Sequence, residues 1–530
     1  MRVMVYLIGT GPGDPGLISV RGLQCLKAAD VVLYDRLVHP RLLRFARGDA
    51  ERIDVGASSP QPLEQEAICY LLAEKAREGK VVARLKWGDP FVFDRGGEEA
   101  LFLHEQGVRF EVVPGVPAAV AVPSYAGIPV TYPGGGDSLT LIRGHEDEGD
   151  ALPDVDWASL ARLKGTIVCY SGARQLPGIV HALLTHGCPG DLPAALVYDG
   201  TLPSQETLEG TLGGMVGLVK QQPSRAGAVL VVGRVVAFRG HLRWFDERPL
   251  FGKRVLVTRT RQQAADLVDG LEALGAEAVE APTIRLLPPE DDSPLTQACA
   301  AVSSFDWIVF TSANGVAAFM TRLQAGPGDV RDLKGIRLCA IGPATADRLQ
   351  QYGVKVDLTP PEYRAEAVVQ ALRATGSLEG ARILLPRADI ARELLADELR
   401  KSGADVLEVI AYRTVLADAD GEGEPDVYRM LLDKRIDVVT FTSASTVRNF
   451  VRIYGAEAAP DLLQSTVVAC IGPVTAEAAE QCDIHPAIVA DPYTIPALVD
   501  AIVAYFSGKA ETGTMGRDGE DGGNRGAGGH

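Results

Sequence analysis

The spacing of hydrophobic residues predicts alternating strands and helices over the first half of the chain. Short runs rich in β-branched residues are separated by longer stretches with helical spacing. Strands are predicted at Val3–Ile8, Val31–Tyr34, Val81–Leu85, Phe110–Val113, Leu139–Ile142, Thr166–Tyr170, Ala194–Val197 and Ala228–Val232. Strands that alternate with helices are typical of an α/β fold. The pattern breaks at Arg243–Gly252 and a new strand is predicted at Val255–Thr258, which indicates a linker between two halves.

The second half contains an internal repeat. Val255-Leu-Val-Thr-Arg259 recurs as Ile383-Leu-Leu-Pro-Arg387, a shift of 128 residues. Three further matches have nearly the same offset: 274–278 with 402–406, 307–314 with 438–445, and 342–343 with 472–473. The repeat predicts two copies of one α/β unit, and a cleft between two such copies is a natural place for a ligand.

Composition and charge narrow the class of protein. The 530 residues, 46% hydrophobic and 23% charged, are typical of a soluble protein with three or four domains. The 52 Lys and Arg against 69 Asp and Glu give a net charge of −17, which argues against a nucleic-acid binder. The glycine-rich segment 508–530 has almost no apolar residues and is predicted to be disordered, because it cannot offset its ordering entropy.

The cysteines and the apolar stretches predict where the protein resides. Its eight cysteines are scattered singly, without metal-like spacing, as is typical of reduced thiols in a cytoplasmic protein. The N-terminus leads directly into the first strand, so no signal peptide is expected. The apolar stretch Val112–Val130 contains four prolines, which argues against a transmembrane helix. We therefore expect no metal, no membrane partner and a cytoplasmic location.

The loop after the first strand matches a dinucleotide-binding fingerprint, but we reject that interpretation. The segment from Gly11 to Gly16 has the G-x-G-x-x-G spacing, and Asp35 follows about 20 residues later at a strand end. A pyrophosphate group needs backbone N–H groups in such a loop. Pro12 and Pro15 have no N–H. A nicotinamide cofactor is therefore not expected.

Several motifs in order carry a family resemblance through the first half. They are Val32-Leu-Tyr-Asp-Arg-Leu37, Arg84-Leu-Lys-Trp-Gly-Asp-Pro-Phe-Val-Phe-Asp-Arg-Gly-Gly-Glu-Glu99, Val112-Val-Pro-Gly115 and Ser124-Tyr-Ala-Gly-Ile-Pro-Val-Thr131. Through these motifs, residues 1–246 resemble the tetrapyrrole methylases, and within them the uroporphyrinogen-III C-methyltransferases. The resemblance implies two α/β domains that enclose S-adenosylmethionine, the methyl donor, and a homodimer formed through this half.

The resemblance also implies roles for individual residues. Asp35 matches the carboxylate that handles the proton. Residues that match cofactor contacts are Pro12, Gly88, Asp89, Val92, Pro117, Ala118, Ser171 and Gly200. A polycarboxylate substrate requires cationic donors, for which the candidates are Arg36, Arg95, Arg143 and His145. From the sequence alone, Asp35 and Asp89 also fit a role as caps of a helix or turn.

Four single positions and one segment depart from the pattern of the methylases, the segment being Ile128-Pro-Val-Thr-Tyr-Pro133, which lacks the usual His-Arg ending. Trp87 stands where glycine is usual, and Ala57 stands where the family has a lysine that is implied to donate a proton. Pro117 and Ser171 replace the usual threonine and methionine. Each of these departures is expected to lie at the active site of the first half.

The second half resembles uroporphyrinogen-III synthase over residues 252–507. The motifs are Phe310-Thr-Ser-Ala-Asn314, Ala340-Ile-Gly-Pro343, Val409-Ile-Ala-Tyr-Arg-Thr414, Phe441-Thr-Ser443 and Ile471-Gly-Pro-Val-Thr-Ala476. The resemblance implies two lobes, one formed by 252–284 with 416–507 and the other by 285–415, and a reaction that needs no cofactor. Tyr412 matches the tyrosine that assists departure of a hydroxyl. Ser312, Asn314, Ser443 and Thr475 match positions that line the cleft, although Thr-Ser after a strand also fits a helix N-cap.

The two resemblances predict a bifunctional enzyme, because the product of the second half is the substrate of the first. It would cyclise hydroxymethylbilane to uroporphyrinogen III with inversion of ring D and methylate that product to precorrin-2, on the route to sirohaem and cobalamin. Two alternatives stay open at this point. The first half could methylate a later corrin intermediate, and the second half could be a non-catalytic tetrapyrrole-binding module.

Overall fold

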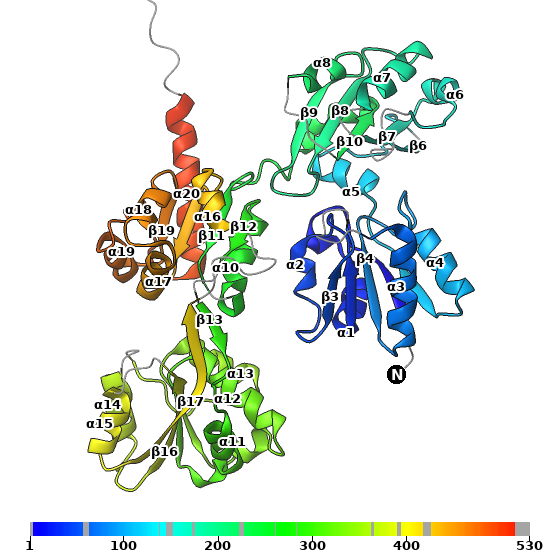
Figure 1. Cartoon of the computed structure of the whole chain (residues 1–530). Coiled ribbons are helices and arrows are strands. Elements are labelled where there is room, and N and C mark those ends of the chain that lie inside the picture. Colours follow the sequence, from blue (N-terminus) through cyan, green and yellow to red (C-terminus); the bar gives the residue numbers. More distant parts are fainter. Residues whose placement is uncertain are drawn as a thin grey trace, which may run out of the picture. The chain divides into compact units, whose positions relative to one another are not determined.

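Four five-stranded sheets with helices packed on them make up the described part of the chain (Figure 1). The computed structural model describes residues 4–56, 63–136, 138–144, 152–171, 175–221, 227–259, 261–281, 284–361, 365–389, 394–416 and 426–514. Within these residues the chain divides into two compact units. One contains the residues up to Val255 together with Leu267–Ala278 and the residues from Val499, and the other contains Leu256–Asp266 and Val279–Leu498.

The first sheet is entirely parallel, with the strand order β3-β2-β4-β1-β5. Its strands are β1 (Val5–Gly9), β2 (Val31–Tyr34), β3 (Glu51–Asp54), β4 (Val82–Lys86) and β5 (Phe110–Val113). The accompanying helices are α1 (Val20–Ala28), α2 (Pro40–Leu43), α3 (Gln65–Arg77) and α4 (Gly96–Glu105). The central strands are buried on both faces, which explains their continuous apolar runs. Because the strands are parallel, the loops after β1, β2 and β4 meet at one edge.

The second sheet is mixed, with the order β6-β7-β10-β8-β9. Its strands are β6 (Leu139–Arg143), β7 (Thr166–Ser171), β8 (Pro193–Tyr198), β9 (Glu206–Thr211) and β10 (Ala228–Val232). Only β6 and β7 pair in parallel, and β7, β10, β8 and β9 pair antiparallel. Helix α5 (Ala118–Tyr125) leads from the first sheet toward the second. The other helices are α6 (Trp157–Arg162), α7 (Leu176–Thr185), α8 (Met215–Val219) and α9 (Arg239–Leu242).

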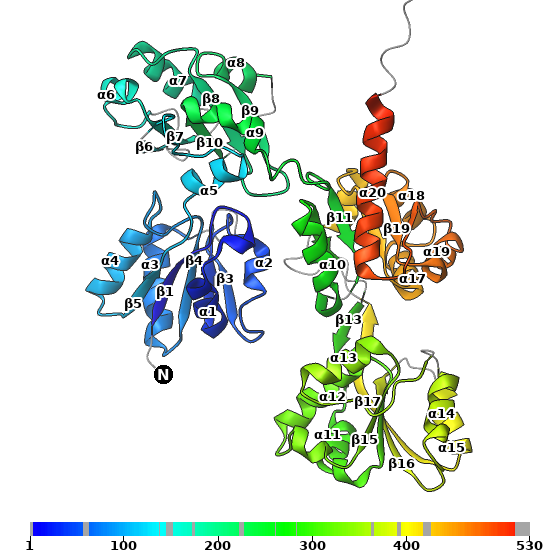
Figure 2. The same ribbon diagram turned by 180° about the vertical axis from the view of Figure 1, so that it is seen from behind.

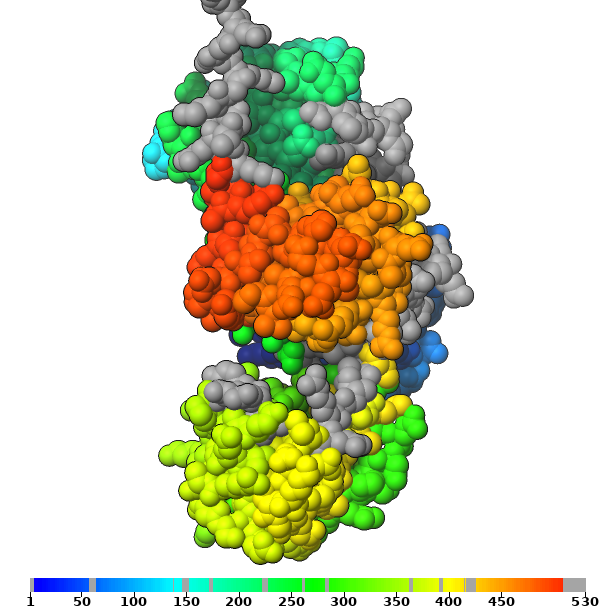
Figure 3. Space-filling model, turned by 90° about the vertical axis from the view of Figure 1, so that its left-hand side faces the viewer, coloured from blue at the N-terminus to red at the C-terminus, as the bar shows by residue number. Residues whose placement is uncertain are grey.

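The third sheet is assembled from two distant segments, in the order β12-β11-β18-β19-β20. Its strands are β11 (Arg254–Val257), β12 (Glu277–Glu280), β18 (Val438–Phe441), β19 (Val467–Cys470) and β20 (Ile488–Val489). Helices α10 (Arg261–Ala273) and α20 (Ile495–Thr514) lie side by side (Figure 2). A second group of helices packs in one core with β11, β18 and β19: α16 (Val427–Leu432), α17 (Ala444–Tyr454), α18 (Ala458–Leu463) and α19 (Pro473–Glu480). Helices α18 and α19 form part of the orange face in the space-filling view (Figure 3).

The fourth sheet has the order β13-β17-β16-β14-β15 and repeats the plan of the third. Its strands are β13 (Ile284–Leu287), β14 (Trp307–Phe310), β15 (Arg337–Ala340), β16 (Arg382–Ala388) and β17 (Asp405–Leu416). The helices are α11 (Ser293–Ala300), α12 (Ala313–Ala325), α13 (Pro343–Gln351), α14 (Ala365–Ala374) and α15 (Leu394–Lys401). The order β17-β16-β14-β15 corresponds to β12-β11-β18-β19, which confirms the repeat expected from the sequence.

Each predicted strand of the first half is present in the structure, with ends that coincide with the prediction or differ from it by at most two residues. The edge strands β3 and β9 were not predicted, because they are polar and partly exposed and so lack the apolar signal. The disorder expected from residue 508 is not found over residues 508–514, because α20 continues to Thr514. Extension of a helix that has already formed needs no new nucleation, and Lys509, Ala510 and Glu511 have high helix propensity. The residues beyond 514 lie outside the described part.

The described residues bear on three further expectations. No helix among them is long and apolar enough to cross a membrane. None of the eight cysteines, all of which the structure describes, forms a disulfide, and seven are buried. The described residues contain no cluster of three or more metal-ligating side chains.

Candidate active sites

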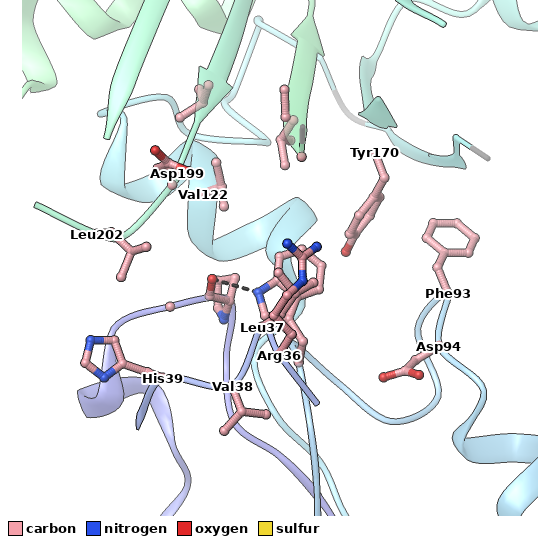
Figure 4. A pocket seen from close by; sticks show the side chains of 18 of the residues that line it. Arg36, Leu37, Val38, His39, Phe93, Asp94, Val122, Tyr170, Asp199 and Leu202 are labelled. Atoms are coloured by element: carbon pink, nitrogen blue, oxygen red, sulfur yellow. Dashed lines mark hydrogen bonds between the residues drawn. The ribbon is translucent and has the colours of Figure 1, made fainter. Parts of the chain in front are cut away.

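A cavity of about 760 Å³ lies in the first half, between the first and second sheets. The loops after β1, β2 and β4 contribute one side, and α5, β6, β7, β8 and β10 contribute the other. Figure 4 shows Phe93, Asp94 and Tyr170 along one wall and His39, Asp199 and Leu202 along the opposite one. The site therefore stands where parallel strands end, which is a usual position for ligands in α/β folds.

Several residues singled out from the sequence line this cavity. Pro12, Arg36, Arg95 and Gly200 are among the lining residues, and so is Arg143. Gly200 packs so closely against Val122 that an added Cβ would lie 2.4 Å from Cγ1 of that side chain. The structure thus gathers residues from four separate loops and one strand around one space.

The departure at Trp87 also lies in the cavity wall. Its indole Nε1 donates a hydrogen bond of 2.8 Å to the carbonyl oxygen of Pro12, which ties the loop after β4 to the loop after β1. Backbone hydrogen bonds of 3.1 and 2.9 Å between Gly11 and Gly88 reinforce the same connection. Gly88 has a φ of 67°, a conformation that favours glycine.

A second group of predicted cofactor residues supports the cavity without lining it. Among the described lining residues, Gly88, Asp89, Val92, Pro117 and Ala118 do not appear. The Asp89 carboxylate accepts hydrogen bonds from the N–H groups of Phe91 at 2.8 Å and Gly115 at 2.9 Å.

The remaining members of that group occupy structural positions. Pro117 is the N-cap residue of α5 and Ala118, the next residue, is fully buried. Val92 is half-buried in the loop after β4. Ser171 ends β7, but its side chain lies outside the described part, as do His145 and Ala57.

Asp35 belongs to a largely buried network of charges that reaches the cavity at Asp94. Both of its carboxylate oxygens accept hydrogen bonds from Arg84, at 2.8 and 3.0 Å. Arg84 also contacts Glu99 at 3.2 Å, and Glu99 accepts a hydrogen bond from Lys86 at 3.0 Å. Lys86 in turn contacts Asp94 at 2.9 Å. Five groups of alternating charge are thus connected, which offsets the cost of burying Arg84, Lys86 and Glu99.

Three lining residues that have clear chemistry, Asp94, Tyr170 and His39, were not singled out from the sequence. Asp94 is a largely buried carboxylate, and Tyr170 packs edge-on against Phe93 with ring centroids 5.3 Å apart. Burial lowers the pKa of His39 from 6.5 to about 4, with Arg41 adding to the shift, so its imidazole is neutral near pH 7. The available signal for Asp94 was its place as a titratable residue within the motif from Arg84 to Glu99, whereas nothing local marks Tyr170.

In the second half, the structure brings Tyr412 and Ser312 together. The Tyr412 hydroxyl lies 3.0 Å from Oγ of Ser312, although 100 residues separate them in the sequence. Tyr412 is on β17, and Ser312 is the N-cap residue of α12, where its Oγ accepts a hydrogen bond from the Gly315 N–H at 2.9 Å. Asn314 follows in the first turn of the same helix. Ser312 is therefore both a helix cap and a partner of the phenol.

The other predicted residues of this half, Ser443 and Thr475, lie at helices that pack on the third sheet. Ser443 is the N-cap residue of α17, with the reciprocal hydrogen bonds to Thr446 that define a capping box. Thr475 is in the first turn of α19 and only 4% exposed. Ser443 and Ser312 are equivalent in the repeat, and both have the capping role that the sequence left open.

Comparison with known proteins matches each half to a family. Residues 4–216 match the family described as Tetrapyrrole (Corrin/Porphyrin) Methylases, and residues 265–500 match the family described as Uroporphyrinogen-III synthase HemD. The porphyrin biosynthesis protein HemD of Ruminiclostridium josui is 37% identical over 505 residues, which cover 95% of this chain and 98% of that protein.

Two further relatives cover smaller shares of the chain. The uroporphyrinogen-III C-methyltransferase of Bacillus subtilis is 36% identical over 378 residues, or 71% of this chain and 77% of that protein. A solved uroporphyrin-III C-methyltransferase of Thermus thermophilus, complexed with S-adenyl homocysteine, is 37% identical over 44% of this chain and 99% of its own, with a TM-score of 0.39. The chain therefore belongs to the tetrapyrrole methylase and uroporphyrinogen-III synthase families, which it joins in a single polypeptide.

Proposed function

We propose that this protein catalyses two consecutive reactions of tetrapyrrole biosynthesis. The second half cyclises hydroxymethylbilane to uroporphyrinogen III with inversion of ring D, and the first half methylates that product to precorrin-2, on the route to sirohaem and cobalamin. The observation that carries the proposal is the presence of both families in one chain, matched over nearly its whole length by a single relative.

The cavity of the first half suits S-adenosylmethionine as the methyl donor. Its volume of about 760 Å³ lies within the range of roughly 300–1,000 Å³ that is usual for small-molecule sites. The rings of Trp87 and Tyr170 and the carboxylate of Asp199 line it, and aromatic faces and negative charge both favour a sulfonium cation. When bound, S-adenosylmethionine supplies a methyl group that is already activated by the positive sulfur.

The same cavity offers cationic donors for a substrate that has many carboxylates. Arg36 and Arg143 line the cavity, and neither has an ion-pair partner among the described residues. Arg95 lines it too, and its guanidinium contacts Glu98 at 2.9 Å. Planar guanidinium groups bind carboxylates in a bidentate manner. These side chains can therefore orient a ring carbon of uroporphyrinogen III toward the methyl group, and alignment of this kind is a large part of catalysis.

In the second half, Tyr412 and Ser312 support the proposed cyclisation. A phenol can donate a hydrogen bond to the departing hydroxyl of the bilane. Ser312, 3.0 Å away, holds the phenol oxygen in place, and α12 holds Ser312 through the Gly315 N–H. This hydrogen bond between Tyr412 and Ser312 favours catalysis over the alternative, because a non-catalytic tetrapyrrole-binding module would not require it. We also expect the protein to be a homodimer through its methylase half, which light scattering in solution tests.

A coupled assay tests both activities in one experiment. The full chain is incubated with hydroxymethylbilane and S-adenosylmethionine. The type-I and type-III isomers of the products are then separated by chromatography, and their masses are determined by mass spectrometry. We expect a dimethylated type-III product. An unmethylated type-I ring, which forms spontaneously, would contradict the synthase activity. An unmethylated type-III ring would contradict the methylase activity and leave the synthase activity established.

A further inference from the structure

Asp94 is the acidic residue of the buried network that faces the cavity. It lies in the loop between β4 and α4, and its side chain is 21% exposed. Figure 4 places its carboxylate at the wall, next to Phe93 and below Tyr170. At the other end of the network, Asp35 does not appear among the described residues that line the cavity.

The two oxygens of the Asp94 carboxylate have different surroundings. Oδ1 accepts a hydrogen bond from the Arg95 N–H at 2.6 Å and lies 2.9 Å from Nζ of Lys86. Oδ2 has no hydrogen-bonding partner among the described residues. One oxygen is therefore anchored to the protein and the other is available to a ligand in the cavity. Asp35 differs, because both of its oxygens bind Arg84.

The anchor of Asp94 is itself rigid. Lys86 is 1% exposed on the central strand β4, and its Nζ is held between Asp94 and the fully buried Glu99. A buried lysine with two carboxylate partners cannot turn toward solvent without leaving charges unpaired. The position of the Asp94 carboxylate is thus fixed by the core of the first sheet rather than by its loop alone.

From this geometry we infer that Asp94 is the catalytic residue that accepts the proton released after methyl transfer, a role that rests on the proposed function. An electron pair of a pyrrole carbon forms the new bond to the methyl group while the sulfur keeps the electrons of the broken bond. The ring system is then left with one positive charge. Oδ2 of Asp94 takes one proton from this cation, which restores a neutral ring and leaves a neutral carboxylic acid that returns its proton to water.

The electrostatic surroundings suit this task. Burial raises the pKa of the Asp94 carboxyl, and Lys86 opposes part of the rise. A base works best when its pKa approaches the working pH. The charged groups that interact with Asp94 are Lys86 from β4, Asp35 from the loop after β2 and, through Lys86, Glu99 from α4. The other charged residues that line the cavity are Arg36, Arg95, Glu98, Arg143 and Asp199.

Asp94→Asn tests the inference, since the amide preserves shape but cannot take the proton. We expect methylation of uroporphyrinogen III to slow by about 10²–10⁴-fold in kcat. The KM values and the affinity for S-adenosylhomocysteine, measured by calorimetry, should stay near those of the wild type. Asp94→Glu should restore part of the rate. In the wild type, kcat should fall as the pH drops through the raised pKa of Asp94, and this limb should vanish in Asp94→Asn.

Two parallel variants make the outcome decisive. Asp49→Asn changes an exposed aspartate that pairs with Arg47 away from the cavity, and should retain wild-type kcat. Asp35→Asn should lower the melting temperature, because it leaves the buried Arg84 with one acidic partner. Wild-type kcat in Asp94→Asn, or a larger kcat loss in Asp35→Asn with unchanged melting temperature, would overturn the inference. A wild-type chain that does not methylate uroporphyrinogen III would instead refute the proposed function, and the inference with it.

Discussion

Asp89→Ala separates direct contact with the cofactor from support of the cavity wall. The resemblance implies that Asp89 contacts the cofactor. In the structure its carboxylate accepts hydrogen bonds from the N–H groups of Phe91 and Gly115, and so joins two loops. The first of these loops also contains the lining residues Trp87 and Phe93. We therefore expect the alanine variant to weaken cofactor binding by releasing the loop after β4.

The size of the effect follows from the two hydrogen bonds. A hydrogen bond to a charged group contributes about 1.5–3 kcal/mol. Loss of both bonds therefore costs about 3–6 kcal/mol of local stability. Cofactor binding must then restore the order of the loop, so the binding free energy of the cofactor becomes less favourable by at least about 3 kcal/mol. Since about 1.4 kcal/mol corresponds to a tenfold change, Kd should rise by roughly 100-fold or more.

Calorimetric titration with S-adenosylhomocysteine measures this change. Asp156→Ala is the matched control, because Asp156 accepts a hydrogen bond from the Ser159 N–H at 3.0 Å as the cap of α6, away from the cavity. It should leave Kd unchanged. Synthase turnover should be normal in both variants. A Kd in Asp89→Ala within threefold of the wild type would refute the reasoning, since the loop would then hold its shape without the carboxylate.

Three other substitutions test separate parts of the structure. Tyr412→Phe should keep the fold and lower synthase turnover by about 10²–10⁴-fold, as expected for loss of general-acid assistance; wild-type turnover would leave Tyr412 as a packing residue beside Ser312. Because burial favours the neutral imidazole, the contribution of His39 to the free energy of unfolding is largest above pH 6.5. As the pH falls to 4, the free energy of unfolding should lose up to about 3 kcal/mol of this contribution. Urea unfolding of His39→Asn, which retains a helix cap, should lack that loss, and identical pH profiles would contradict it. Gly200→Ala should lower the melting temperature and the cofactor affinity by collision with Val122, and the added change Val122→Ala should restore both; failure of this rescue would show that the close approach is not the cause.

The sequence by itself determined the elements, the repeat and the two families. The strands of the first half are buried, β-branched runs, and burial of this kind leaves a local signal that can be read without the fold. The repeat at a constant offset predicted two equivalent sheets, and their strand orders agree. Edge strands such as β3 (Glu51–Asp54) escaped detection because half-exposed polar residues leave no such signal.

The tertiary structure decided how the singled-out residues act. The sequence around Asp89 and Ser312 would look the same whether their side chains bound a ligand or a backbone N–H. Only the fold shows that both side chains accept hydrogen bonds from backbone N–H groups. Tyr412 meets Ser312 because β17 and β14 belong to one sheet, an arrangement that no local pattern contains. Asp94 lines the cavity and keeps Oδ2 without a hydrogen-bonding partner among the described residues, whereas Arg84 binds both oxygens of Asp35. This difference arises from the fold, because adjacent parallel strands bring side chains from distant segments to one edge.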